Sequence, residues 1–491
     1  MTYIRASEIG CALDCNLQNG RNKYKGGPAT DDGPRINAAM AGATAEHPIT
    51  LIIDGSALIS GLFLPAGGNW SIAGLGCGTG FFVKSGTNND GIHNGPDAGI
   101  PSDPGPPAPV RSGMNVSLSN FTVNGNRGDG HHGDATGGVA QGANGVGFFG
   151  INLMNLNNIV IDKVVVVNSP EYNIRFANVG NVVVSGCVVR TFGPNSDGLH
   201  FDGPANDITI TNCDFTTDDD SIALNCPEGY SGDISRVAVS NCTFNSWSLM
   251  RLYTANANYR YNIDTVTVSN CTGTLSEYAF VIGLGYTSNL QAVNGLTISD
   301  CKLTAPMLLG IEENFGSIAL RNVTLTPNQS NVIWNKYQTN KTNAFLRPSP
   351  VDGPLTCTGS SLSFENCVIY RNSDEDVPAV VLENGSIIGS VEFNGFAVQD
   401  AGSHSKAKEL LNLESASIGQ LTITSIDSTN IEAPISADNF AGLGSVSGGG
   451  VLATGWEFPD ALMANGVPYI SADSGLPSIK VNGVVQPYSP G

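Results

Sequence analysis

The sequence predicts an all-β parallel β-helix, a solenoid of stacked coils. One observation is a repeat: five cysteines recur at intervals of 26, 29, 29 and 30 residues, and each ends a short alternating run of apolar and small polar residues. These are Cys187, Cys213, Cys242, Cys271 and Cys301. The other is composition, because 60 glycines and only 13% charged residues favour short strands and turns over helical bundles. The repeat therefore indicates coils that bury their inward side chains on their neighbours.

The repeated phrase supplies the expected strands. It reads VVVSGC, ITITNC, VAVSNC, VTVSNC and LTISDC before the five cysteines, and it recurs as VSLSNF (116–121), IALRNV (318–323) and LSFENC (362–367). We expect the cysteines to stack as a ladder of small side chains along the core. The residue before each cysteine, often Asn, is expected to form a turn that tolerates the left-handed backbone conformation.

The chain is expected to have three parts. Residues 1–110 would form an N-terminal cap and the first coils, residues 111–400 the main β-helix, and residues 401–491 a β-rich cap or assembly segment. In the N-terminal cap, Asp31 or Asp32 can begin a short amphipathic helix ahead of the strand ITLIIDG. The segments 84–113 and 124–147 are rich in Gly, Pro, Asp and His and are predicted to be long loops.

The charge balance limits the partners. The 43 acidic and 23 basic residues give a net charge of -20 without a cluster of Lys and Arg, so we expect neither nucleic acid nor a membrane surface as a partner. The N-terminal stretch MTYIRASEIGCALDC has no signal-peptide pattern, and no run of 18 apolar residues occurs. A secreted or virion-associated location is still favoured. We expect a monomer or a homotrimer that needs no metal and no cofactor.

Four acidic residues form the candidate site. Asp197 stands alone, and Asp218, Asp219 and Asp220 follow about one coil later. Because stacked coils lie about 4.8 Å apart, Asp197 should lie beside Asp219 and Asp220. Inverting glycoside hydrolysis uses a protonated and an ionised carboxyl group roughly 6.5 to 9.5 Å apart, and crowding raises the pKa of at least one acid.

Strand phase adds a condition to this hypothesis. If Ile222 and Leu224 point inward, Asp219 and Asp220 can both face solvent only if the chain bends or bulges where their strand begins. Two other interpretations of the acidic run remain open: a solvated acidic turn, and a Ca²⁺ site built from clustered oxygen ligands.

Residues 168–224 resemble the polygalacturonase family, glycoside hydrolase family 28. That family has a Ser-Pro-aromatic phrase, an NTDG motif and, one coil later, a DDxxA motif. Here these read SPEY (169–172), NSDG (195–198) and DDSIA (219–223), in the same order and at similar spacing. The resemblance implies a right-handed parallel β-helix of the pectin-lyase-like type and an enzyme that hydrolyses O-glycosyl bonds with inversion.

The resemblance also implies roles for single residues. Asp219 would be the general acid, Asp197 and Asp220 would position and deprotonate the attacking water, and Asn195 would support Asp197. His200 follows the NSDG motif on the same strand and is expected to contact the substrate. Asp218 stands where the family often has Gly, so the resemblance implies no role for it.

Two departures from the family concern the substrate. Its Gly-His-Gly motif is replaced by Trp247, Ser248 and Leu249, and its Arg-Ile-Lys motif by the stretch EYAFVIGLGY (277–286). In the family the basic pair of the second motif binds a galacturonate carboxylate. The sequence therefore predicts a glycan other than plain galacturonan.

The substitute for those motifs is predicted from strand phase. If Met250 and Leu252 are buried, the alternate positions from Trp247 to Tyr253 share the outward face beside the acids. On that face Trp247, Arg251 and Tyr253 are predicted to bind the sugar, through ring stacking and a forked donor. A packed set of surface aromatics is the alternative.

Three functions fit the sequence. An inverting hydrolase of a polysaccharide or oligosaccharide leads, with a carbohydrate as its partner. A lyase or epimerase acting on uronates is second, with Arg251 abstracting a proton beside a Ca²⁺-binding carboxylate cluster. A tailspike-like carbohydrate-binding protein without catalysis is third, since fold alone does not separate them. Glu312 and Glu313 could line a distal subsite or be simply exposed.

Overall fold

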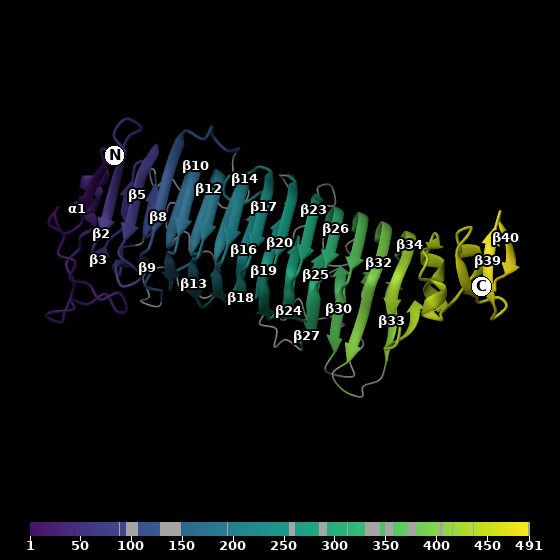
Figure 1. The fold of residues 1–491 in the computed structure, drawn as a ribbon. Coiled ribbons are helices and arrows are strands. Elements are labelled where there is room, and N and C mark those ends of the chain that lie inside the picture. The colour runs from purple at the N-terminus through teal and green to yellow at the C-terminus, as the bar shows by residue number, and fades with distance from the viewer. Residues whose placement is uncertain are drawn as a thin grey trace. The chain divides into compact units, whose positions relative to one another are not determined.

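The computed structural model describes the chain apart from residues 88, 95–106, 128–148, 194, 255–260, 284–291, 312, 329–343, 349–356, 372–379, 384, 401, 403–405, 415, 436 and 490–491. It divides into two compact units, Met1–Asp264 and Thr265–Gly491. In both units, strands of successive coils pair in parallel (Figure 1). The predicted all-β parallel β-helix is therefore confirmed.

In its described residues, the first unit contains one short helix and the first 19 strands. They are α1 (Gly33–Met40), β1 (Thr2–Arg5), β2 (Ile49–Ile53), β3 (Ser56–Ile59), β4 (Leu62–Leu64), β5 (Gly68–Gly74), β6 (Gly80–Val83), β7 (Ile92–Asn94), β8 (Gly113–Ser119), β9 (Thr122–Asn124), β10 (Ile151–Asp162), β11 (Val165–Val167), β12 (Ile174–Ser185), β13 (Val188–Thr191), β14 (Leu199–Thr211), β15 (Asp214–Thr217), β16 (Asp220–Asn225), β17 (Ile234–Ser240), β18 (Thr243–Ser246) and β19 (Ser248–Tyr253).

The N-terminal cap contains the predicted helix. The two aspartates ahead of it accept hydrogen bonds from different backbone segments. Asp32 occupies the N-cap position, yet its carboxylate accepts hydrogen bonds from the backbone amides of Ala12 (2.7 Å) and Leu13 (2.9 Å). The carboxylate of Asp31 accepts from the amide of Gly33, the first helical residue (3.1 Å). Asp32 therefore ties the N-terminal loop to the helix start, and Asp31 satisfies a helix amide.

Alternation along the strands builds the core. β10 pairs with β12 and β12 with β14, all in parallel. In β12, Val182 and Val184 are fully buried, whereas Val183 between them is 39% exposed. Inward side chains of successive coils therefore pack on one another, as a period of two residues requires.

The turns before the cysteines have the predicted form. The residue before each of the five repeat cysteines has a positive φ, for example 55° at Asn212 and Asn241, 59° at Gly186 and 54° at Asp300. The thiols of Cys187 and Cys213 lie in the core, and all eleven cysteines of the chain, Cys11 and Cys15 included, are thiols. The ladder of cysteines is therefore confirmed, without disulfide bonds.

The second unit continues the same kind of coil and adds a small sheet. Its parallel strands extend through β36, past residue 400, where we predicted a boundary. They are β20 (Ile263–Ser269), which begins two residues before the unit, β21 (Thr272–Leu275), β22 (Tyr278–Ile282), β23 (Ala292–Ser299), β24 (Lys302–Ala305), β25 (Met307–Ile311), β26 (Asn314–Arg321), β27 (Thr324–Pro327), β28 (Ala344–Pro348), β29 (Thr358–Glu365), β30 (Val368–Arg371), β31 (Val380–Glu383), β32 (Ile387–Asp400), β33 (Ala407–Glu414), β34 (Ser417–Asp427), β35 (Ile431–Ile435) and β36 (Val446–Ser447).

The C-terminal end of the second unit contains short 3₁₀ turns and a separate four-stranded sheet. The sheet consists of β37 (Glu457–Phe458), β38 (Pro468–Ser471), β39 (Pro477–Val481) and β40 (Val484–Pro487). Most of the two loops predicted at 84–113 and 124–147 lies outside the described residues. Within the part of the chain that the structure describes, no helix has the length and apolar content that crossing a membrane requires.

Candidate active site

The predicted catalytic aspartates lie at corners of the first unit: Asp197 and Asp219 just ahead of a strand, and Asp220 at the first position of β16. The chain bends at Asp218 and Asp219, immediately before β16. Ile222 and Leu224 of β16 are fully buried, so this is the bend that strand phase required. Asp197 lies at the preceding corner, two residues before β14.

Coil stacking brings three carboxylates together. The backbone amide of Gly198 donates to the carbonyl oxygen of Asp220 (2.9 Å) and sets the two corners side by side. One carboxylate oxygen each of Asp197, Asp219 and Asp220 lies within 4.8 Å of the other two. The one-coil spacing predicted this neighbourhood, although the oxygens are closer than the roughly 6.5 to 9.5 Å expected for an inverting pair.

The three acids differ in exposure and in hydrogen bonding. Asp197 is 5% and Asp220 2% exposed, whereas Asp219 is half-buried. The Ser248 hydroxyl donates to Asp220 (2.5 Å), and the backbone amide of Asn195 donates to Asp219 (3.1 Å). Asn195, which we predicted to support Asp197, thus contacts the proposed acid through its backbone.

Asp218, the remaining acid of the run, holds the two corners together. Its carboxylate accepts a hydrogen bond from the backbone amide of Gly193 (2.7 Å), and its own amide donates to the Ser196 hydroxyl (3.0 Å). Both contacts link segment 193–196 to the corner of the next coil. The structure therefore gives Asp218 a supporting position beside the cluster.

His200 lies beneath the acids, where a substrate would not reach it. The side chain is 1% exposed, so the predicted contact with substrate does not fit its burial. Its Nδ1 lies 2.7 Å from Asp197, and its Nε2 lies 3.1 Å from Asp202 and 3.3 Å from Glu228. Both ring nitrogens face carboxylates, an arrangement that suits the doubly protonated imidazolium.

Aromatic rings and an arginine fix the orientation of His200. The His200 ring stacks on Tyr172 (centroids 3.7 Å apart), and Tyr172 stacks on Phe149 (5.2 Å). The guanidinium of Arg175 lies over Phe149 (5.0 Å) and pairs with Asp202 (2.6 Å), which also faces His200. The five side chains thus form a closed circuit of contacts that holds the imidazole in one plane.

The loop 226–233 covers the outward face of β12 and β14. Glu228 of the loop faces His200, and Tyr230 packs against Met154 and Ala177. Gly229 has a φ of +58°, and a Cβ there would lie 2.2 Å from a carboxylate oxygen of Asp202. The close approach of the loop therefore depends on glycine.

The charged groups shift one another's pKa. Burial first, and then Asp197 and Asp220, raise the pKa of Asp219 well above its usual range. Burial and Asp197 also raise the pKa of Asp220 to about 7, against the opposing effects of Arg251 and the Ser248 hydrogen bond. Asp219 therefore keeps its proton to a higher pH than an ordinary carboxyl group does.

The pKa values of His200 and Glu228 shift toward the charged forms instead. Burial disfavours the charged imidazolium, but hydrogen bonds to three carboxylates outweigh it and raise the pKa of His200 well above its ordinary value. Burial would likewise raise the pKa of Glu228, yet the hydrogen bond to His200 and the charge of Arg251 lower it to about 2. This part of the site is an ion-paired network at neutral pH.

The predicted sugar-binding residues of β19 are more buried than alternation suggested. Met250 and Leu252 are fully buried as expected, but Tyr253 is also 0% and Trp247 only 5% exposed. Strand alternation assigns a side chain to a face but does not tell whether that face is covered, and all of β19 except Arg251 is buried. The outward aromatic platform is therefore not present as predicted.

Arg251 is the most accessible of the predicted sugar-binding groups. It is half-buried, lies over the Tyr253 ring (4.8 Å) and pairs in register with Ala223 of β16. Although burial opposes its charge, Glu228 and Asp220 raise the pKa of Arg251. Its Nε has no hydrogen-bond partner among the described residues. The guanidinium is thus a cation beside the acids with hydrogen-bonding capacity left for a ligand.

Among the residues that the structure describes, two sets of side chains have spacings compatible with a metal ion. One is the acid cluster, and the other consists of His200, Asp202 and Glu228. In the second set the imidazole already bonds carboxylates through both nitrogens, so it has no lone pair to offer a metal. The acid cluster offers oxygens for Ca²⁺, but the raised pKa values of Asp219 and Asp220 favour protons there over a high-affinity cation site.

The two glutamates predicted as a distal subsite belong to the second unit. Glu312 lies outside the described residues, and Glu313 is fully buried. Glu277, which the sequence did not single out, is 3% exposed at the bend before β22.

Several residues of the network were not predicted. Tyr172 lies in the SPEY phrase, and Arg175 pairs in register with His200 across one coil, so the 25-residue spacing was a usable signal. Glu228 lies in a loop outside the repeat, and no sequence pattern links it to His200.

Comparison with known proteins places the fold. No protein-family model matches the chain, and no curated protein matches its sequence. A family 28 exopolygalacturonase from Yersinia enterocolitica superposes with a TM-score of 0.59 at 12% identity, covering 86% of this chain and 78% of its own. A hyperthermoactive exopolygalacturonase from Thermotoga maritima superposes with a TM-score of 0.52 at 13% identity, covering 88% and 93%. The Streptococcus pneumoniae surface adhesin PfbA gives a TM-score of 0.46 at 12% identity, covering 100% and 99%. The chain thus shares the parallel β-helix fold of polygalacturonases.

Proposed function

We propose that the protein is an inverting glycoside hydrolase that cleaves a polysaccharide or oligosaccharide other than plain galacturonan. The observation that carries the proposal is the unequal environment of three adjacent carboxyl groups, Asp197, Asp219 and Asp220. Hydrolysis of a glycosidic bond needs one carboxyl group that donates a proton and another that stays ionised.

Asp219 is the proposed general acid. It is the most exposed of the three, so it can reach the leaving oxygen of a bound glycan. Its raised pKa favours the protonated form that a general acid needs, and Asn195 and Asp220 donate backbone hydrogen bonds that fix the carboxyl orientation. A positioned acid with a pKa near the working pH is the efficient case.

Asp197 is the proposed general base, and Asp220 helps to hold the water. The imidazolium of His200 contacts Asp197 at 2.7 Å and stabilises its ionised form. Asp220 is oriented by the Ser248 hydroxyl. In this arrangement Asp197 removes a proton from water as Asp219 protonates the leaving group.

The choice of inversion rests on burial. Asp197 and Asp220 are recessed and already hydrogen-bonded, so a water molecule can reach them more readily than the anomeric carbon of a sugar ring. The separation of at most 4.8 Å between oxygens is nearer to the value of about 5 to 5.5 Å usual for retaining enzymes. Product stereochemistry therefore decides between the two mechanisms.

The lyase alternative is disfavoured by the state of Arg251. A base that abstracts a proton must be able to lose its own, and the neighbouring Glu228 and Asp220 raise the pKa of Arg251. The fold shared with polygalacturonases supports a glycan as substrate. The absence of the Arg-Ile-Lys motif supports a sugar other than galacturonate at the cleavage site.

A single experiment tests the proposal. The protein is incubated with a panel of neutral and acidic glycans, and the products are followed by reducing-end assay, by NMR of the anomeric proton and by ultraviolet absorbance. We expect cleavage with initially inverted configuration, abolished in Asp219→Asn. The matched control is Asp300→Asn, which gives an exposed turn the residue found in other coils.

Retained configuration would replace inversion by a covalent mechanism. Products with ultraviolet-absorbing ends would identify a lyase. Binding without any cleavage across the panel would favour the carbohydrate-binding function.

A further inference from the structure

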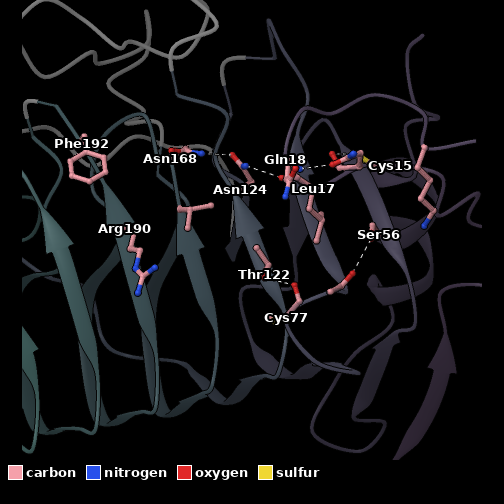
Figure 2. A pocket seen from close by; sticks show the side chains of 14 residues that line it. Cys15, Leu17, Gln18, Ser56, Cys77, Thr122, Asn124, Asn168, Arg190 and Phe192 are labelled. Atoms are coloured by element: carbon pink, nitrogen blue, oxygen red, sulfur yellow. Dashed lines mark hydrogen bonds between the residues drawn. The ribbon is translucent and has the colours of Figure 1, made fainter. Parts of the chain in front are cut away.

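A cavity of about 800 Å³ lies in the first unit on a different side of the coils from the strands that carry His200 and Arg251. Its walls come from the N-terminal loop and from β9, β11 and β13 (Figure 2). Figure 2 shows Phe192 and Arg190 at one end of the cavity and Cys15 and Ser56 at the other. Its volume is in the range of small-molecule sites.

The cavity crosses the strands rather than following one of them. β9 pairs in parallel with β11, and β11 with β13. At a spacing of about 4.8 Å between strands, these three alone span about 10 Å. An elongated ligand lying along the direction of coil stacking would contact one or two side chains from each coil.

The charges in the cavity oppose those of the chain as a whole. Lys23 and Arg190 line it, and none of its lining residues is acidic, although the chain carries a net charge of -20. Arg190 makes an exposed ion pair with Asp214 through one nitrogen (3.3 Å), and its side chain remains 56% exposed. Lys23 lies near Cys15, at the opposite end from Arg190, so cations at both ends of a cavity without lining acids favour an elongated anionic ligand.

The remaining lining groups suit a sugar. Gln18 and Asn168 are exposed amides, and Phe192 presents an aromatic ring that is 62% exposed. Asn124 keeps the wall in place, because its side chain donates to the carbonyl oxygen of Leu17 (2.8 Å) and accepts a hydrogen bond from Asn168. Amides for hydroxyl groups and a ring face for a pyranose are the usual components of a carbohydrate site.

The cavity and the acid cluster share one short segment. Phe192 is followed by Gly193, whose amide donates to Asp218, and Asn195 of the same turn donates to Asp219. A glycan held against Phe192 would therefore lie one turn from the proposed general acid.

We propose that this cavity is an accessory subsite for an acidic oligosaccharide, with Arg190 and Lys23 pairing with its carboxylates and Phe192 stacking on a sugar ring. The proposal takes from the proposed function only that the ligand is a glycan. It concerns binding, and it holds whether or not the glycan is hydrolysed.

The test measures binding by isothermal titration calorimetry to the full chain carrying Asp219→Asn, so that turnover does not interfere. The probes are trimers of galacturonate and mannuronate and, as matched neutral ligands, trimers of galactose and mannose. We expect an acidic trimer to bind and its neutral counterpart to bind at least tenfold more weakly, with affinity falling as NaCl rises. Adding Arg190→Gln should weaken acidic-trimer binding about tenfold, the loss expected for one charge-assisted hydrogen bond.

Two further variants separate the subsite from nonspecific attraction. Phe192→Ala should weaken both ligand classes, since a ring face contacts any sugar. Arg321→Gln is the control, because Arg321 is also an exposed strand arginine paired with one carboxylate (Glu365, 3.2 Å), but it does not line the cavity. Equal affinity for acidic and neutral trimers, equal effects of Arg190→Gln and Arg321→Gln, or no binding of any probe would each overturn the proposal. Failure of cleavage in the wild-type chain with intact binding here would count only against the hydrolase.

Discussion

Two corners of the coils, one in each unit, carry an acidic residue. The backbone setting of the two acids is the same, but the side chains around them differ. Asp219 precedes β16 and Glu277 precedes β22, and each lies at a bend directly before a strand that is buried throughout. Asp219 is half-buried, accepts two backbone hydrogen bonds and lies beside Asp197 and Asp220. Glu277 is buried, burial alone raises its pKa to about 8, and its Oε1 has no partner among the described residues.

The strands that follow these corners differ in the same way. β16 and β19 present Asp220 and Arg251 among their buried or half-buried side chains, with His200 and Asp202 on the neighbouring β14. β22 and β25, by contrast, read YAFVI and MLLGI. Coil geometry alone therefore does not create a site. Charged groups are costly to bury unless they are paired, and beside the first corner His200 is paired with Asp197 and Arg175 with Asp202.

The largest expected effect comes from removing the acid at each corner in turn. Asp219→Asn keeps the shape of the side chain but has no proton to donate, so kcat should fall about 10³-fold. Glu277→Gln should leave kcat within about twofold, because burial, and not a neighbouring charge, raises the pKa of Glu277. Steady-state kinetics on the glycan cleaved by the wild type measures both. Similar losses in the two variants would show that the distinction between the corners is wrong.

The second prediction concerns the effect of Glu277 on how the free energy of unfolding depends on pH. Its pKa is about 8 in the folded chain against 4.5 in the unfolded one, so the folded state holds a proton that the unfolded state releases. The contribution of Glu277 to the free energy of unfolding should therefore be largest below pH 4.5 and fall as pH rises toward 8, by on the order of 3 kcal/mol at pH 7. The decline should be smaller by this amount in Glu277→Gln, where Asp219 and Asp220, whose pKa values are also raised, still contribute. Urea denaturation at pH 5 and pH 8 measures it, and equal pH dependence in the variant and the wild type would contradict it.

The third prediction concerns the network beneath the first corner. His200→Asn removes the cation that holds Asp197, and kcat should fall about 10- to 100-fold, the usual cost of losing an orienting partner. If His200 only supported the fold, the pH profile of kcat would keep its shape. We expect the profile to change shape, because His200 is the cation in contact with the proposed base. His93→Asn, at a buried imidazole beside Asp90, is the matched control.

The smallest effect is expected at Arg251. Arg251→Lys keeps the charge and removes the forked donor, so KM should rise about fivefold to tenfold with kcat little changed. A fall in kcat with unchanged KM would place Arg251 in the transition state instead of in substrate binding.

The repeat made much of the fold and of the acid cluster predictable, since coil period and strand phase can be read from the sequence. The cysteine spacing predicted the coils, and the 22 residues from Asp197 to Asp219 predicted that their carboxylates would meet. Strand phase also predicted the bend before β16, because Ile222 and Leu224 had to face inward.

The contacts made by loops were not predictable in this way. Glu228 and Tyr230 belong to a loop without a repeat, yet this loop covers the outward face of β12 and β14. For the same reason the burial of Tyr253 was missed, because alternation predicts which face a side chain takes but not whether a loop lies over that face. The loop buries His200, so this residue supports the acids from below and does not contact substrate at the surface as predicted.

The left-handed turns before the cysteines bear on how a chain of this kind can gain coils in evolution. Asn212 and Asn241 adopt the same backbone conformation 29 residues apart, and each is followed by a thiol in the same core column. A sequence segment bounded by two such turns, when inserted at a third, would keep its strands in register with the neighbouring coils. Duplication of a whole coil is thus a small genetic step with little structural penalty, and the chain can lengthen while the corner that carries Asp219 stays unchanged.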